Sequence, residues 1–121
     1  ARIAFGGQGF ALDERLHEID IGDFSGRLSS ELHAAHPEAF ARGPLDWYDL
    51  APGGEHFAGL EARVRAFLDD LDGPALIVTH GITLRMLRLV AMDLPLERLA
   101  EMPVSQGGLH LVSRSRHRMF L

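Results

Sequence analysis

Two stretches in the second half of the chain place apolar residues at the spacing of an amphipathic helix. Between residues 57 and 71, Leu60, Val64 and Phe67 follow one another at intervals of three or four, with charged residues between them. This period predicts one helix over 57–71, ended by the Asp-Gly-Pro that follows it. The apolar residues of Ile82–Met92 predict a second helix.

Two apolar runs predict β-strands on either side of the second helix. Leu76–Thr79 is typical of a buried strand in a parallel sheet, and Leu109–Ser113 of a terminal strand. A short helix is expected near Leu96–Glu101. The order helix, strand, helix, strand predicts an α/β fold with helices on the faces of the sheet. A sheet buried on both faces needs several strands, so two convincing ones leave it incomplete.

The first half of the chain carries weaker patterns. Ser29 or Ser30 can cap a short helix over Glu31–Ala35 that ends before Pro37. Gly43–Gly54 holds the only Trp and Tyr and predicts an irregular segment of the kind that often lines sites. The other expected elements are the end of a helix over Ala1–Phe5, a short extended piece over Phe10–Leu12 and a loop-rich segment over Asp13–Gly26.

Composition predicts a single domain over residues 1–121. The chain is 46% hydrophobic, and no apolar stretch is long enough to cross a membrane. A net charge of −5 argues against nucleic acids and anionic membranes as partners. The absence of cysteine excludes disulfides, thiolate metal sites and cysteine nucleophiles. The same absence of cysteine fits a cytoplasmic protein, which is the localisation we expect.

His80 and Gly81 stand where the predicted strand meets the second helix. The carboxyl ends of parallel strands are where open α/β sheets bind ligands, and the following helix offers unpaired N–H groups and a positive dipole end. Gly81 allows close approach of the backbone, and His80 adds a donor that can be cationic near neutral pH. These features predict an anion site that suits phosphate. A core histidine capped by a turn glycine is the alternative for His80 alone.

Three motifs follow one another along the chain. Leu16–Gly26 fits L-x-E-x-x-x-G-x-[WF]-x-G, Pro52-Gly53-Gly54-Glu55 comes next, and Thr79-His80-Gly81 ends the predicted strand. In this order the motifs resemble the histidine phosphatase superfamily, the phosphoglycerate-mutase-like enzymes. The resemblance implies a three-layer αβα fold with a mostly parallel central sheet.

The resemblance also implies roles for matching residues. His80 matches the second active-site histidine, which donates to phosphoryl oxygens together with the backbone at Gly81. Glu18 matches the carboxylate that acts as general acid and base, although alone it would be taken for a solvated loop residue. Glu55 matches a position near the substrate pocket, and it could equally cap the next helix. His56 stands where the family often has serine, which leaves its contact with substrate open.

The family's nucleophilic histidine belongs to an Arg-His-Gly motif that is absent from these 121 residues. We therefore expect that an N-terminal portion carrying this motif and further strands precedes Ala1, and that residues 1–121 alone are inactive and marginally stable. A divergent protein that lost the nucleophile, serving as a phosphate-ligand or interaction module, is the alternative.

The sequence from Glu18 to Gly26 and the compact stretch from Arg27 to Leu50 resemble the phosphatase branch, so we favour hydrolysis over mutase chemistry. The prediction is hydrolysis of a small phosphomonoester through a phosphohistidine intermediate, without metal or organic cofactor. Trp47 and Tyr48 would shape the pocket entrance, which hints at a leaving group with apolar surface. Neither the identity of the phosphomonoester nor the oligomeric state follows from the sequence.

Two further groups of residues are assigned no function. His33 and His36 could share a helix face as metal ligands, but a solvated pair is favoured because no third ligand stands at a telling spacing. Arg114, Arg116 and His117 form a basic C-terminal patch that we expect to be a solvated tail.

Overall fold

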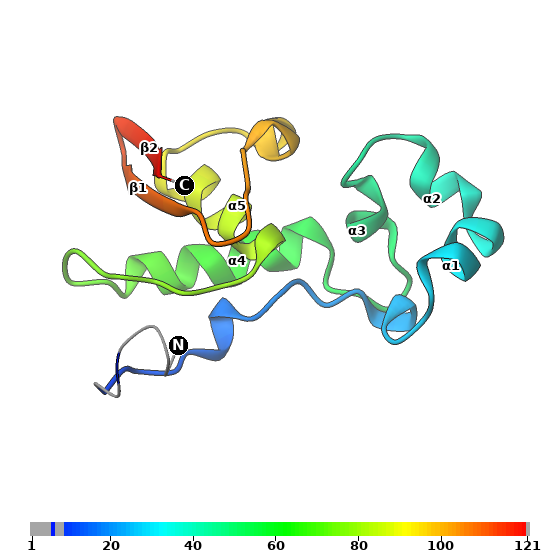
Figure 1. Cartoon of the computed structure of the whole chain (residues 1–121), viewed down its shortest axis with the longest axis horizontal. Coiled ribbons are helices and arrows are strands. Elements are labelled where there is room, and N and C mark those ends of the chain that lie inside the picture. Colours follow the sequence, from blue (N-terminus) through cyan, green and yellow to red (C-terminus); the bar gives the residue numbers. More distant parts are fainter. Residues whose placement is uncertain (1–5, 7–8, 121) are drawn as a thin grey trace.

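The computed structural model describes residues 6 and 9–120 (Figure 1). Helix α4 runs across the middle of the molecule, with α5 and a β-hairpin on one side and the short helices α1, α2 and α3 beyond the end where α4 begins. The helices and strands are α1 (Ser29–Ala35), α2 (Pro37–Ala41), α3 (Asp46–Leu50), α4 (His56–Asp69), α5 (Gly81–Ala91), β1 (Leu109–Ser113) and β2 (Arg116–Phe120). Three 3₁₀-helices, η1 (Glu14–Leu16), η2 (Gly22–Phe24) and η3 (Leu96–Glu101), complete the order.

The main core lies between α4 and α5. The stripe of Leu60, Val64 and Phe67 on α4 is buried, and it packs in one cluster with Met86 and Leu89 of α5. The apolar periodicity had predicted these helices over 57–71 and 82–92, and the observed bounds lie within two residues of the predicted ones. Burial of the two facing apolar stripes therefore holds α4 and α5 together, and the other elements pack around these two helices.

Both core helices have specific ends. The Asp49 carboxylate accepts the backbone N–H of Phe57 at 2.7 Å in the first turn of α4. At the other core helix, Asp93 adopts a left-handed φ of 55° after α5, and the Leu94 N–H donates to the Leu89 carbonyl at 3.0 Å. This geometry turns the chain sharply away from α5. Within the described part of the chain, none of the helices is long and apolar enough to traverse a lipid bilayer.

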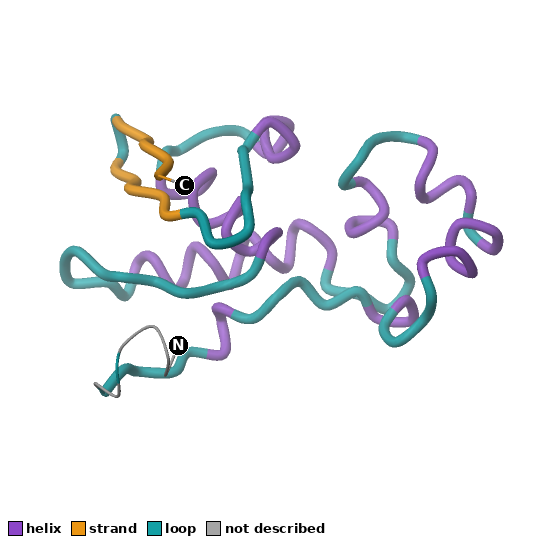
Figure 2. Tube along the Cα trace, viewed as in Figure 1, coloured by secondary structure: helices purple, strands orange, loops and turns teal. Residues whose placement is uncertain are grey.

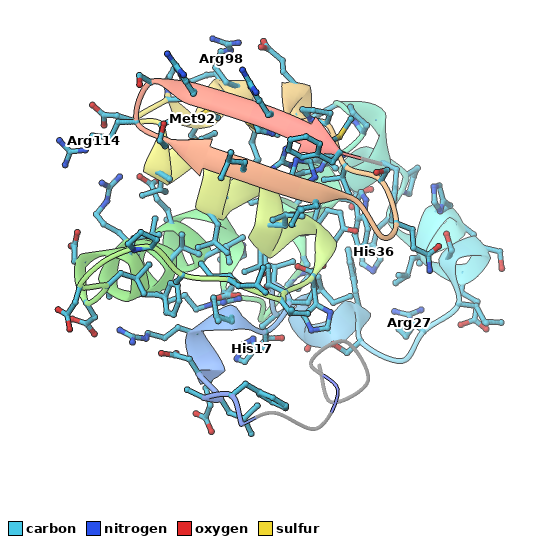
Figure 3. All side chains as sticks on the ribbon, turned by 60° about the vertical axis from the view of Figure 1, so that its left-hand side comes forward. His17, Arg27, His36, Met92, Arg98 and Arg114 are labelled. Atoms are coloured by element: carbon cyan, nitrogen blue, oxygen red, sulfur yellow. The ribbon has the colours of Figure 1, made fainter. Side chains whose placement is uncertain are left out.

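The hairpin of β1 and β2 lies across α5 (Figure 3). Its strands are antiparallel, with Leu109 opposite Phe120 and Val112 opposite His117. Strand β1 has the predicted bounds, whereas β2 was wrongly expected to be a solvated tail. The reason is that β2 carries few apolar residues: Arg116 and Arg118 are exposed, and His117 between them is partly buried.

Residues 76–79 do not form the predicted β-strand. They run as an unpaired extended segment beside α4 (Figure 2). Ile77 packs against the core, but Leu76 and Val78 are 67% and 53% exposed. A strand exists only where a second one completes its hydrogen-bond ladder, and no described residue supplies a partner here. The described sheet is therefore two-stranded and antiparallel, so the described residues combine helices and strands without the predicted three-layer parallel sheet.

The first half of the chain is more helical than its sequence indicates. Helix α1 begins two residues before the predicted start, and Pro37 opens α2 as its first residue instead of only ending α1. Gly43–Gly54, expected to be irregular, contains α3. A second small cluster of Phe24, Leu32, Ala39 and Ala51 joins these short helices. Phe10–Leu12, expected to be extended, lies in a loop, and η1 and η2 interrupt the predicted loop over 13–26. Helix η3 has the bounds expected for a short helix. The expected helix end at 1–5 lies outside the described residues.

We predict that Leu60→Ala lowers the free energy of unfolding by about 2–5 kcal/mol, because it leaves a cavity between α4 and α5. Leu60 is fully buried, whereas Leu12 is 88% exposed and serves as the matched control. Leu12→Ala should change the stability by less than about 0.5 kcal/mol. Chemical denaturation followed by circular dichroism measures both, and equal effects would contradict the described core.

Candidate active site

The carboxylate of Glu18 caps the N-terminus of α5. Its Oε2 accepts the N–H of Ile82 at 3.1 Å, and its Oε1 accepts the N–H of Thr83 at 3.0 Å and lies 3.1 Å from the Thr83 hydroxyl oxygen. A Cβ atom added at Gly81 would stand 3.7 Å from the Glu18 Oε2. The fold thus brings Glu18 beside His80-Gly81, and it does so at helix amides that would otherwise lack an acceptor.

The backbone of the Glu18 segment is held from three sides. Thr83 on α5 donates its hydroxyl to the His17 carbonyl at 2.7 Å, and the Thr79 hydroxyl donates to the Leu16 carbonyl. Arg63 on α4 donates to the carbonyls of Arg15 and Glu18 at 2.6 and 3.2 Å. The segment therefore has little freedom although it contains no α-helix or strand. This rigidity is what keeps the carboxylate aimed at α5.

The first two sequence motifs cross each other directly. Asp23 donates its N–H to the Pro52 carbonyl at 2.9 Å, and Glu55 donates its N–H to the Asp20 carbonyl at 3.0 Å. At Gly22, which has a φ of 49°, a Cβ atom would come within 2.3 Å of the backbone of Gly53. Only glycine permits this crossing, which explains the glycine of the first motif physically.

Glu55 forms an ion pair with Arg63. Its carboxylate receives the Arg63 Nη2 at 2.7 Å and Nε at 2.9 Å, and it also accepts the Asp20 N–H at 3.0 Å. Burial by itself would raise the pKa of Glu55, but the hydrogen bonds from Arg63 and Asp20 outweigh it and hold the pKa below its ordinary value. Since Arg63 also donates to the Glu18 carbonyl, Glu55 helps to position the Glu18 backbone by holding the Arg63 side chain in place.

His80 is the N-cap residue of α5, with extended backbone angles of φ −106° and ψ 172°. Its carbonyl accepts the Leu84 N–H at 2.7 Å, while its imidazole is exposed and makes no hydrogen bond to the described residues. His17 is a second exposed imidazole next to Glu18, with its Nδ1 2.9 Å from the Glu18 carbonyl. Two imidazoles thus flank the segment that carries the carboxylate.

Trp47 and Tyr48 lie on α3 with their rings stacked at a centroid distance of 3.7 Å. The Trp47 ring also stacks on Phe40 at 5.6 Å and lines a cavity of about 410 Å³ shared by η2, α1, α2 and α3. Burial raises the pKa of Tyr48, the negative charge of Glu18 raises it further, and Arg85 acts in the opposite direction. Tyr48 is therefore within electrostatic reach of Glu18 and Arg85, whereas Trp47 belongs to the aromatic cavity.

Three kinds of functional group meet at the amino end of α5. The site combines the amino end of α5, the exposed His80 imidazole and an internal carboxylate, a set suited to charge stabilisation and proton transfer. The described residues contain no group of three or more potential metal ligands. His33 and His36 instead pack against aromatic rings, His33 on Phe40 at 3.8 Å and His36 near Phe24 at 5.0 Å.

Sequence reasoning missed Arg63, Thr83 and Arg85. Thr83 follows His80 by three residues and so lies near the start of the same helix, which was a readable signal. Arg63 carried no signal, because its contacts with residues 15 and 18 span 48 and 45 positions along the chain. Arg85 donates to the carbonyls of Ala100 and Met102, and so ties the segment after η3 to α5.

Comparisons with known proteins indicate the family of the chain. A family model described as "Histidine phosphatase superfamily (branch 1)" matches residues 1–121. Two relatives come from Hydrogenobacter thermophilus (strain DSM 6534 / IAM 12695 / TK-6). "Putative phosphoserine phosphatase 2" is 30% identical over 112 residues, which are 85% of this chain and 53% of that protein. "Phosphoserine phosphatase 1" is 30% identical over 90 residues, 68% of this chain and 43% of that protein. The chain thus spans about half the length of the curated relatives it matches.

We predict that Arg63→Met lowers the free energy of unfolding by about 2–3 kcal/mol, because it leaves the Glu55 carboxylate without its cation. Arg65→Met is the matched control on the same helix, where an exposed pair with Glu61 should contribute less than about 0.5 kcal/mol. Denaturant titrations at neutral pH measure the difference. Similar losses in the two variants would contradict a supporting role for Arg63.

The same pair predicts a pH dependence. The folded-state pKa of Glu55 lies below its ordinary value of 4.5, so its contribution to stability is present above pH 4.5 and is lost as the pH falls through the lower folded-state value. Arg63→Met should remove this contribution, so that the stabilities of variant and wild type converge at acid pH. A difference in unfolding free energy between wild type and variant that stays constant down to pH 2 would contradict this contribution from the Glu55–Arg63 pair.

Proposed function

Since the chain belongs to branch 1 of the histidine phosphatase superfamily, we propose that the complete protein hydrolyses a small phosphomonoester through a phosphohistidine intermediate. The observation that carries this proposal is the meeting of Glu18 with His80-Gly81 at the N-terminus of α5. In this proposal Glu18 transfers protons and the His80 imidazole donates to the phosphoryl group, both at the same helix end. Phosphoryl transfer needs mainly positioning and charge stabilisation, which this arrangement offers.

In the proposed reaction, the phosphoryl group lies beside Gly81 with the His80 imidazole donating to one of its oxygens. A nucleophilic histidine nitrogen attacks phosphorus, the bond from phosphorus to the leaving oxygen breaks, and Glu18 gives its proton to that oxygen. Water then attacks the phosphohistidine, Glu18 takes the proton from the water, and phosphate leaves.

The proposed nucleophile lies upstream of Ala1, within an Arg-His-Gly segment that also adds strands to a three-layer sheet. The unpaired extended segment over residues 76–79 supports this arrangement, because it ends at His80 and has the apolar composition of a buried strand. Residues 1–121 alone should then have no phosphatase activity. The intact protein needs no metal in this scheme, and we propose that it acts in the cytoplasm.

The names of the two relatives make phosphoserine a first substrate to test. Among the proposed pocket residues, Tyr48 is the one within electrostatic reach of Glu18, while Trp47 and its stacked neighbours wall the adjoining cavity. Glu55 would act on the pocket through Arg63 and the Glu18 carbonyl. The leaving group would then meet a partly aromatic wall.

We predict that His80→Ala lowers turnover of an aryl phosphate by on the order of 10²-fold or more in the complete protein, assayed with EDTA present. The imidazole is exposed, so the variant should keep the wild-type melting temperature. His36→Ala, which removes a histidine in contact with Phe24, is the control and should keep its turnover. Near-wild-type turnover in folded His80→Ala, or activity that requires a divalent metal, would overturn the proposal.

We predict that the loss of turnover in Glu18→Gln depends on the leaving group of the substrate. An alkyl phosphate such as phosphoserine needs a proton on its leaving oxygen, so its turnover should fall at least about tenfold more than that of an activated aryl phosphate. Glu31→Gln, which changes an exposed carboxylate on α1, should affect neither substrate. Equal losses with both substrates would reduce Glu18 to a capping residue of α5, and circular dichroism separates this outcome from unfolding.

A further inference from the structure

Three buried polar atoms without hydrogen-bond partners belong to the last turn of α5 and to the chain around β1 that packs near it. They are the Nη2 of Arg88 on α5, the Oγ of Ser105 in the loop before β1 and the Nε2 of His110 on β1, and they are the full set of such side-chain atoms found in residues 6 and 9–120. Ser105 and His110 face a common point, because a Cβ atom at Gly108 would stand 2.5 Å from Ser105 Oγ and 3.6 Å from His110 Nε2. Arg88 contacts His110 directly.

The contacts between these groups determine which of them donate. The Arg88 Nη1 lies 3.1 Å from the His110 Nδ1, and a guanidinium can only donate, so this Nδ1 accepts. The proton of neutral His110 therefore sits on Nε2, the unpartnered nitrogen. The His117 Nε2 on β2 lies 3.0 Å from the His110 Nδ1 and 3.4 Å from the Arg88 Nη1, so both of its printed contacts are within this cluster. All three unpartnered groups can thus donate, and the missing partner is an acceptor.

The charge balance indicates what kind of acceptor fits. Arg88 is only 1% exposed, and its side chain makes no ion pair within the described part of the protein. Burial, followed by the charge of Arg85, lowers the pKa of Arg88 to about 10. Burial and then Arg88 likewise lower the pKa values of His110 and His117. The groups that meet here from α5, β1 and β2 are therefore all bases, and a buried cation of this kind is costly without an anion.

We propose that Arg88, Ser105 and His110 form a binding site for a small oxyanion, separate from the site at Glu18 and His80. Arg88 follows His80 by eight residues along α5, which places it about 12 Å further along the helix axis. Because His110 faces Arg88 with its Nδ1 and Ser105 with its Nε2, different oxygens of one phosphate, sulfate or carboxylate accept from the guanidinium and from the hydroxyl–imidazole pair. The same anion neutralises Arg88, which a water molecule cannot do.

The test uses the His80→Ala protein, so that phosphate bound at the candidate active site does not contribute. The imidazole nitrogens of His110 and His117 are observed by ¹⁵N NMR while sodium phosphate, sulfate or acetate replaces chloride at constant ionic strength. We expect saturable shifts at His110 with phosphate and sulfate, and weaker ones with acetate if the site favours an inorganic anion over a carboxylate. Shifts no larger than those in chloride with all three anions overturn the proposal.

Three further variants of the His80→Ala protein test whether the anion-dependent shifts come from the proposed site. Arg88→Met removes the guanidinium at similar volume and should weaken anion binding by at least about tenfold. Ser105→Ala is a smaller change that should weaken binding several-fold, and it keeps the test valid if Arg88→Met does not fold. Arg65→Met removes an exposed arginine and should leave the titration unchanged. Anion-dependent shifts that survive both Arg88→Met and Ser105→Ala would also overturn the proposal.

Discussion

The capping of α5 by Glu18 is the interaction on which the site depends. A helix leaves its first N–H groups without intrahelical acceptors, and here a carboxylate from 64 and 65 residues earlier in the chain supplies one to Ile82 and Thr83. Because the same residues begin the helix that follows His80, the cap joins two of the three motifs in one place. Thr79, Thr83 and Arg63 then hold the backbone that presents the carboxylate.

This polar junction rests on the apolar pair of α4 and α5. Leu60 and Val64 are buried against α5, so Arg63 between them is held on the adjacent side of α4, toward the Glu18 segment. The Glu55 carboxylate fixes the Arg63 fork in turn. Apolar packing therefore determines where α4 and α5 lie. The hydrogen bonds between Glu55 and Arg63 and from Arg63 to the Glu18 carbonyl then position Glu18 relative to these helices.

The predictions from sequence succeeded where one local pattern decides the outcome. The 3.6-residue period was enough for α4 and α5, and the apolar run over 109–113 was enough for β1. Residues 76–79 have the same kind of composition but no strand, because a strand also requires a partner that composition does not show. Strand β2 was missed for the opposite reason, since Arg116 and Arg118 form a ladder with few apolar residues.

The candidate site was predictable only in part. The motifs identified Glu18 and His80, which the fold brings to one helix end, but they did not indicate Arg63, whose partners are distant in sequence. Glu55 was assigned to a pocket from its motif, and the structure places it in an ion pair with Arg63. The sequence motif correctly drew attention to Glu55, but its ion-pair partner could be identified only from the folded structure.

The extended segment before His80 has a consequence for motion. No backbone N–H from residue 72 to residue 81 donates a hydrogen bond to the rest of the described chain, while the N–H groups of Ile82 and Thr83 are held by Glu18. In residues 1–121, amide hydrogens should therefore exchange rapidly with solvent over 72–81 and slowly from Ile82 onward. His80 stands at this boundary, with its carbonyl held by the Leu84 N–H. A strand that pairs with residues 76–79, as proposed for the complete protein, would slow the exchange up to His80 and so fix the backbone that presents the imidazole.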